Sequence, residues 1–289
     1  MHVAREHPID GAGRMMNRLF RGLFLLCAIS SAADCASADE VKRMIQGIES
    51  YRQSYILLDS YNDHYNYNSI YGPAVGNTYM HQEVKFQISF QGVIADIGSK
   101  ELGFSYTQQS YWQLYNTPLS APFRETNYEP ELFIRWQDSE NPLLGKDTFY
   151  RLGFDHQSNG QSQPHSRSWN RLYGEVKLQD PNDVWVGALR AWWRIPEKAS
   201  RDDNPNITQY YGFWQFDGRW TPYEDQKIHI MLRDNLHAKN KGAVQLDWSW
   251  KVFHDFSLYA QGFYGYGESL IEHNYVSARV GAGILLTNW

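Results

Sequence analysis

Long apolar runs are scarce in this chain of 289 residues. Beyond the N-terminal region it has no stretch of about eighteen consecutive apolar residues, the length that a membrane-spanning helix needs. Charge of one sign is scarce too, because the formal net charge is only -5 and the charged residues form no blocks. These absences disfavour a helical membrane protein, and we expect no nucleic-acid partner.

Cysteine is nearly absent, since the sequence contains only Cys27 and Cys35. Both lie in an N-terminal region that we expect to be removed, so the mature chain would have no disulfide framework and no thiol chemistry. An exported domain without disulfides must be stabilised by its fold alone. A closed β-barrel can provide that stability.

The N-terminal region has the pattern of a secretory signal peptide. Arg18 and Arg21 precede the apolar run 23–29, and small residues follow up to Ala38. This pattern predicts export with cleavage after Ala38, so that residues 1–38 comprise an upstream extension and the signal peptide. The alternative is an N-terminal membrane anchor, but the apolar run is too short to span a bilayer.

From residue 83 onward the dominant hydrophobic period is two. Apolar and polar residues alternate in the segments 83–91, 227–233, 244–252 and 276–286. A period of two predicts strands with one apolar and one polar face. Clusters of Asn, Asp, Gly, Pro and Thr separate these segments, as expected for the turns of antiparallel hairpins.

We count eleven such segments from residue 83, and Tyr55 to Asp59 can supply a twelfth. The spacing of about 21 residues per strand and turn suits a transmembrane β-barrel with strands of about ten residues. We therefore expect an all-β fold, a transmembrane antiparallel barrel of about twelve strands over residues 55–289. Residues 39–54 would form an N-terminal arm.

A soluble sandwich or a lipocalin could show the same alternation with its apolar face turned inward. Aromatic residues make up 16% of this chain, with 20 Tyr and 11 Trp. Several lie at the ends of expected strands, as in Tyr111-Trp112 and Trp192-Trp193. Aromatic girdles at both membrane interfaces are typical of transmembrane barrels, so the membrane interpretation is favoured.

The hairpin predicted around residues 150–173 carries a polar group on its apolar faces. His156 and Ser158 share a face with Phe154, and Asn170 lies on the apolar face of the return strand. Opposed residues of an antiparallel hairpin have a constant sum of residue numbers. A sum of 326 places His156 opposite Asn170, at about 4.5 to 5.5 Å between Cβ atoms. Ser158 then lies near, two residues along the same face.

These three residue types fit nucleophilic catalysis. A serine hydroxyl is a weak nucleophile until a base removes its proton, and an imidazole can do so. A third polar group, here the amide oxygen of Asn170, fixes the tautomer of that imidazole. The alternative is that His156, Ser158 and Asn170 form a wet patch at the headgroup level of a porin-like or structural outer-membrane barrel.

The pattern His156-x-Ser158-Asn-Gly, followed by Ser166-Arg-Ser-Trp-Asn170, resembles the active-site signature of the outer-membrane phospholipase A family. Further similarity lies in 116–130 and 265–270, and the resemblance covers most of the chain from about residue 55. It implies a twelve-stranded barrel in the bacterial outer membrane with its active site facing the outer leaflet. The implied substrates are phospholipids and lysophospholipids.

The resemblance also implies roles for individual residues. Ser158 would be the nucleophile, His156 the base and Asn170 the orienting residue, while the backbone N–H of Gly160 would stabilise the oxyanion. Activation would depend on Ca²⁺ and on homodimerisation.

The implied calcium ligands are the Gln161 carbonyl and the Ser166 hydroxyl of one subunit, with Ser120 from the other. Ca²⁺ accepts such neutral oxygen ligands. Gln163 stands where the family pattern has an acidic residue. This departure argues against a calcium site in the monomer. Gln108 lies on the apolar face of its strand, where an amide exposed to lipid is costly. It resembles a dimer-contact residue of the family.

The other polar residues suggest structure rather than chemistry. His165 is expected in a solvated loop. We expect five charged residues to form an ion network in the lumen: Arg124, Glu125, Glu129, Glu131 and Arg135. The sequence has no Gly-x-Ser-x-Gly elbow, which disfavours a soluble α/β-hydrolase, and no residues at zinc-ligand spacing.

Overall fold

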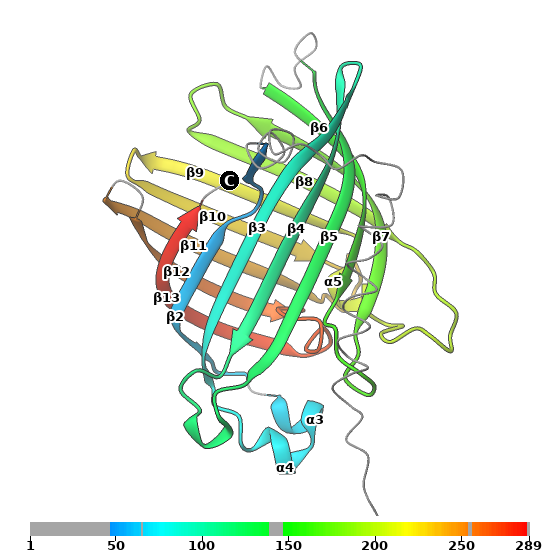
Figure 1. The fold of residues 1–289 in the computed structure, drawn as a ribbon, viewed down its shortest axis with the longest axis vertical. Coiled ribbons are helices and arrows are strands. Elements are labelled where there is room, and N and C mark those ends of the chain that lie inside the picture. Colours follow the sequence, from blue (N-terminus) through cyan, green and yellow to red (C-terminus); the bar gives the residue numbers. More distant parts are fainter. Residues whose placement is uncertain (1–46, 65, 139–146, 254–255, 288–289) are drawn as a thin grey trace, which may run out of the picture. The chain divides into compact units, whose positions relative to one another are not determined.

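The computed structural model describes residues 47–289 apart from residues 65, 139–146, 254–255 and 288–289. The predicted signal peptide and residues 39–46 of the predicted arm therefore lie outside the described residues. All the strands of the described chain belong to one antiparallel sheet (Figure 1).

Thirteen strands are assigned in the described chain. They are β1 (Ile48–Ser50), β2 (Ser54–Asn62), β3 (Gln82–Ile97), β4 (Lys100–Trp112), β5 (Phe123–Asp138), β6 (Asp147–Ser158), β7 (Ser168–Gln179), β8 (Trp185–Arg194), β9 (Trp214–Tyr223), β10 (Gln226–Asp234), β11 (Gly242–Phe253), β12 (Phe256–Tyr266) and β13 (Val276–Thr287). The short helices are α3 (Tyr67–Tyr71), α4 (Pro73–Gly76), η2 (Thr117–Leu119) and α5 (Thr208–Tyr211).

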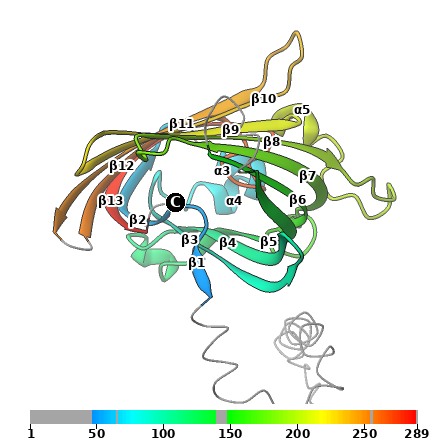
Figure 2. The ribbon, with the colours of Figure 1, turned by 90° about the horizontal axis from the view of Figure 1, so that it is seen from above.

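The sheet closes on itself because β13 pairs with β2, and β2 in turn pairs with β3. Strands β2 to β13 form a closed ring of twelve (Figure 2). The short β1 pairs with β3 next to β2, with Ile48 opposite Gly92. The predicted antiparallel barrel of about twelve strands is confirmed. The boundary between arm and barrel at residue 55 stays a prediction, although β1 already pairs with the barrel.

The two faces of the barrel wall have the polarity expected in a membrane. On β3 the side chains of Glu83 and Lys85 are buried in the interior, whereas Ile88 is exposed on the outside. On β11 Leu246 is 55% exposed, while its neighbour Asp247 is 1% exposed. A soluble sandwich or lipocalin would turn the apolar face inward, so these alternatives are excluded. Among the described residues, no helix is long and apolar enough to cross a membrane.

The interior is held together by paired charges. Arg124 pairs with Glu83 at 2.6 Å and with Glu272 at 3.2 Å. A second group joins Glu129 to Arg52 at 2.9 Å and to Arg171 at 3.0 Å. Each of these charges has an opposite charge at hydrogen-bond distance, which offsets its loss of hydration.

The predicted ion network is thus confirmed for Arg124 and Glu129. It is also confirmed for Glu131, which pairs with Arg190, and for Arg135, which pairs with Glu49 and Glu101.

The two ends of the barrel carry connections of different length. At one end the described turns are short, 98–99, 180–184 and 224–225. At the other end all six connections are longer: 63–81, 113–122, 159–167, 195–213, 235–241 and 267–275. Helices α3 and α4 lie beyond the strands at this second end (Figure 1).

The outward apolar face generates a stability prediction. Leu246 lies near the middle of β11 and faces outward, so Leu246→Arg places a charge against hydrocarbon. We expect the unfolding free energy in lipid vesicles to fall by about 2–4 kcal/mol. The control Leu246→Phe keeps an apolar surface and should remain close to wild type in a chemical unfolding titration. Equal stability of both variants would contradict the assignment of this face to lipid.

Candidate active site

The hairpin of β6 and β7 brings the predicted catalytic residues together. His156 pairs with Asn170 and Ser158 pairs with Ser168, the register expected from the sequence. The register continues without a bulge up to the pair Ser158 and Ser168, and the nine-residue connection 159–167 joins these two residues. His156, Ser158 and Asn170 are all partly exposed on the outer face of the wall.

The imidazole of His156 contacts the Asn170 amide directly. The distance between His156 Nδ1 and Asn170 Oδ1 is 2.9 Å. An amide oxygen only accepts hydrogen bonds, so Nδ1 carries the proton in this pair. In the neutral ring Nε2 is then free to accept a proton, which is the tautomer that a general base requires.

The site opens toward the lipid side of the barrel. Phe154 lies two residues before His156 on β6, and Leu172 lies two residues after Asn170 on β7. Both side chains are on the outer face and are 40% and 47% exposed. Leu152 and Trp193 continue this apolar surface. The polar group is therefore adjoined by an exposed apolar surface on the outer wall.

The connection between β6 and β7 is organised by Asn159, which is buried. Its Oδ1 accepts hydrogen bonds from the backbone N–H of Gln161 at 3.3 Å and of Arg167 at 2.9 Å. Its Nδ2 donates to the carbonyl of His165 at 2.9 Å. One side chain thus holds both ends of the loop, an arrangement in which the loop backbone keeps a fixed path. His165 is partly exposed, and its ring packs against the ring of Tyr71 with 5.1 Å between the ring centres.

Glu125 of β5 supports this loop from inside the barrel. Its carboxylate accepts hydrogen bonds from the amides of Gln161 at 2.7 Å and Asn127 at 2.7 Å. The Asn159 amide also donates to it, at 3.4 Å. The sequence predicted Glu125 as part of an ion network, whereas these contacts make it an acceptor for amides.

Gly160 adopts a backbone conformation that favours glycine. Its φ is +65°, and a Cβ at this position would lie 3.3 Å from a ring carbon of Tyr128. Tyr128 on β5 is the register partner of Ser158. A side chain at residue 160 would therefore be strained by its backbone and would crowd the Tyr128 ring.

The predicted calcium ligands lie in two separate connections. Gln161 and Ser166 belong to 159–167, and Ser166 Oγ donates to Asp203 Oδ2 at 2.6 Å. Gln163 donates to the other oxygen of Asp203 at 2.5 Å. Ser120 belongs to 113–122. Within the described part of the chain there is no cluster of three or more His, Cys, Asp or Glu residues that could hold a metal.

Gln108, the predicted dimer contact, lies in the same row of paired residues across the sheet as Ser158. It pairs with Tyr128 on β5, which in turn pairs with Ser158 on β6. Its amide accepts a hydrogen bond from Tyr106 at 2.9 Å and donates to Ser110 at 3.2 Å. These contacts along its own strand reduce the cost of placing an amide on an outward face.

Comparison with known proteins settles the family. A sequence profile described as Phospholipase A1 matches residues 32–286. Phospholipase A1 of Proteus vulgaris is 37% identical over 251 residues, which cover 82% of this chain and 80% of that protein. Phospholipase A1 of Escherichia coli K12 is 38% identical over 219 residues, covering 71% and 70%. The chain belongs to the phospholipase A1 family.

Solved structures of the family agree with this barrel. The outer membrane phospholipase dimer of Salmonella typhi with bound calcium superposes with a TM-score of 0.77 at 33% identity, covering 83% of this chain and 92% of that one. Outer membrane phospholipase A of Escherichia coli also gives 0.77, at 32% identity, covering 86% and 97%. The predicted family and the predicted enzyme class, a phospholipase, are confirmed.

Sequence reasoning missed three neighbours of the site. Tyr128, on β5, lies opposite Ser158 on β6, and Asp203 contacts Ser166. Glu197 accepts a hydrogen bond from Asn170 Nδ2 at 3.3 Å. The β7–β8 pairing, in which Arg171 faces Arg194, would have predicted the position of Glu197.

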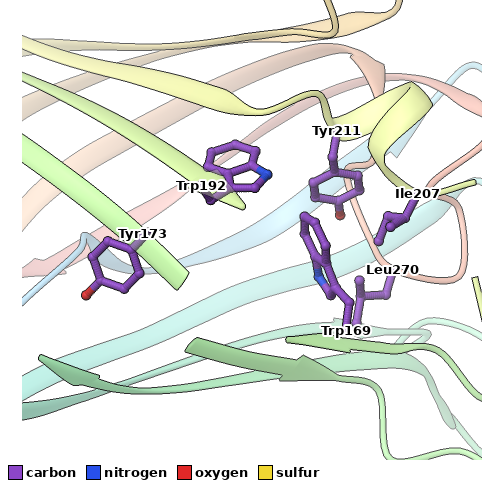
Figure 3. Close-up of a cluster of buried hydrophobic side chains, with 6 residues drawn as sticks. All are labelled: Trp169, Tyr173, Trp192, Ile207, Tyr211 and Leu270. Atoms are coloured by element: carbon purple, nitrogen blue, oxygen red, sulfur yellow. The ribbon is translucent and has the colours of Figure 1, made fainter. Parts of the chain in front are cut away.

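An apolar cluster lies on the inner side of the site. Trp169, between Ser168 and Asn170 in sequence, is fully buried. Its ring packs edge-to-face against the ring of Tyr211, with 5.3 Å between the ring centres. Figure 3 shows Trp169, Tyr211, Ile207 and Leu270 gathered together, with Tyr173 farther off. The cluster therefore fixes the start of β7 from within the barrel.

His273, in the connection 267–275 near this cluster, contacts the neighbouring connection 195–213. Its two ring nitrogens lie 3.0 Å from the Leu270 carbonyl and 3.0 Å from Asn206 Oδ1. Burial lowers the pKa of His273 to about 4, so that the ring is uncharged at neutral pH. We assign it a structural role in this part of the family fold.

The buried tryptophan generates a second stability prediction. Trp169→Ala removes the largest fully buried side chain of the cluster, and we expect the unfolding free energy to fall by about 3–5 kcal/mol. Trp169→Phe, the matched control, keeps an aromatic ring and should lose less. Chemical unfolding followed by tryptophan fluorescence of the remaining residues measures both. An alanine variant as stable as wild type would show that this cluster does not anchor β7.

Proposed function

We propose that this family member is a calcium-dependent phospholipase of the bacterial outer membrane that hydrolyses acyl esters of glycerophospholipids and lysophospholipids. The observation that carries the proposal is the 2.9 Å contact between His156 and Asn170, beside Ser158, on the lipid-facing wall. Membership of the phospholipase A1 family supports it.

In the proposed mechanism, Ser158 Oγ attacks the ester carbonyl while His156 Nε2 takes the hydroxyl proton. Asn170 holds the ring through Nδ1, as the third member of a catalytic triad does. The imidazolium then gives its proton to the leaving alcohol, the lysolipid, and an acyl-enzyme remains. Water, deprotonated by His156, releases the fatty acid and restores Ser158.

The oxyanion of each tetrahedral intermediate needs a donor in a fixed place. Gly160 directly follows the buried Asn159, whose hydrogen bonds fix the loop. The backbone N–H of Gly160 is our proposed oxyanion donor. The positive φ of Gly160 and the nearby Tyr128 ring support this role, because both require the absence of a side chain there.

Calcium would be held by the Gln161 carbonyl and the Ser166 hydroxyl, together with Ser120 of the partner subunit. These are neutral oxygens of the kind that Ca²⁺ accepts. The Asp203 carboxylate at 2.6 Å from Ser166 Oγ provides a negative charge at this position, which compensates for the neutral Gln163. Bound calcium would supply positive charge next to the oxyanion.

A homodimer follows from this ligand set, since Ser120 is assigned to the partner subunit and the other two ligands to the first. The relative from Salmonella typhi is a dimer with bound calcium, which supports the same assembly here. Gln108, at the level of Ser158 on the outer wall, is our proposed contact residue. A dimer through this face would bury the Gln108 amide away from lipid.

The orientation of the site follows from the connections. Outer-membrane barrels have short turns on the periplasmic side and longer loops outside. His156, Ser158 and Asn170 lie next to the connection 159–167, at the end with the long connections. We propose that the active site faces the outer leaflet.

Replacement of the nucleophile tests the proposal. We expect Ser158→Ala to abolish fatty-acid release from detergent-solubilised phospholipid at saturating calcium, because the Ser158 hydroxyl is the proposed nucleophile. The barrel should still fold, as judged by its heat-dependent migration in gels. Ser257→Ala on β12 is the matched control and should keep full activity. Hydrolysis by the Ser158 variant, or a wild-type barrel that only releases solute from liposomes, would reject the mechanism.

The calcium ligand from the second subunit gives a further test. Since each ion would bridge two subunits, calcium binding and dimerisation must stabilise each other. We expect Ser120→Ala to raise the calcium concentration for half-maximal activity by about tenfold, a cost of about 1.4 kcal/mol. Cross-linking should shift by the same factor.

The matched control is Ser99→Ala, in a short turn at the opposite end. Both variants are compared with wild type over one calcium titration of cross-linking and fatty-acid release. If Ser120→Ala dimerises and hydrolyses lipid at wild-type calcium levels, Ser120 is not a ligand.

A further inference from the structure

The pairing of β7 with β8 continues past the end of β8. Arg171 faces Arg194 in the strands, and the backbone N–H of Ile195 donates to the Asn170 carbonyl at 2.9 Å. The residue two positions on, Glu197, therefore lies on the same outer face and diagonal to Asn170. Side chains at diagonal positions of adjacent strands are within reach of each other.

The two side chains meet. Asn170 Nδ2 donates to Glu197 Oε1 at 3.3 Å, while Asn170 Oδ1 contacts His156 Nδ1 at 2.9 Å. One amide therefore connects the imidazole to a carboxylate. Both Asn170 and Glu197 are partly exposed.

The carboxylate decides how the amide is oriented. An ionised carboxylate only accepts hydrogen bonds, so it selects the orientation in which the Asn170 nitrogen faces Glu197 and the oxygen faces His156. The reversed amide would place an oxygen against the carboxylate and an N–H against Nδ1. Glu197 thereby selects the ring tautomer with its proton on Nδ1 and the basic lone pair on Nε2.

We propose that Glu197 is a positioning residue of the active site, which holds the Asn170 amide and places a negative charge two hydrogen bonds away from the His156 ring. This inference rests on the proposed function. A neutral amide stabilises an imidazolium less than a carboxylate does. The chain His156–Asn170–Glu197 supplies that charge through a polarised hydrogen bond.

Charged groups of the neighbouring segments have contacts of their own. Arg194, at the end of β8, pairs with Asp202 at 2.6 Å. Arg167, at the end of the loop 159–167, donates to the carbonyls of Pro164 and Ser166. Lys198 is exposed to solvent. The Glu197 carboxylate is the acidic group that the Asn170 amide contacts.

The first test compares Glu197→Gln and Glu197→Ala with wild type and with Glu224→Gln, an exposed control in the β9–β10 turn. We expect Glu197→Ala to lower kcat by about tenfold, the size of one lost hydrogen bond, with little change in KM. Glu197→Gln keeps an acceptor and should lose less. In both variants the acid limb of the kcat/KM profile should move to lower pH, because the base loses a negative charge.

The second test exchanges the polarity of the pair. Asn170→Asp alone sets two carboxylates against each other, and neither can donate. Adding Glu197→Gln restores a donor, so Asn170→Asp/Glu197→Gln should exceed Asn170→Asp in kcat by about tenfold. Such a rescue depends on direct contact and would not arise from a loss of folding.

The outcomes separate this inference from the function on which it rests. Wild-type protein that releases no fatty acid with calcium overturns the proposed function, and this inference with it. An active wild type together with a Glu197→Gln profile identical to that of Glu224→Gln overturns only the role of Glu197. Additive effects of the two substitutions in the double variant also overturn it.

Discussion

The pairing of β13 with β2 is the contact on which the rest of this structure depends. In a bilayer, an unpaired strand edge would leave backbone N–H and C=O groups in hydrocarbon, at several kcal/mol for each group. Closure leaves each strand from β2 to β13 with a partner on both sides. Within this closed ring, β6 pairs with β7 in the register that places His156 opposite Asn170.

The same closure separates support from chemistry. The interior holds paired charges and the aromatic cluster of Trp169, whereas His156, Ser158 and Asn170 lie on the outer face. Glu125 on the inside binds the amide of Gln161 in the loop that follows Ser158. The proposed active site is therefore held from the lumen, while its side chains lie on the outer wall.

Periodicity and hairpin arithmetic predicted the barrel and the pairing of His156 with Asn170, because both depend on residues close together in sequence. Glu197 was missed since its position follows from the β7–β8 register and from a connection, 195–213, that has no regular period. Tyr128 and Asp203 were missed because their neighbours lie on separate strands and loops. The roles proposed for Ser120 and Gln108 depend on a second subunit, which one sequence does not display.

The use of asparagine in this site has a physical reason in its surroundings. A carboxylate at residue 170 would carry its charge above Phe154 and Leu172 on a wall that faces lipid, where ionised groups are costly. Glu197 lies instead at the level of Ser168, nearer the long connections and water. Placing the charge two residue pairs further out, and passing its effect through a neutral amide, reconciles a polarised histidine with a membrane surface.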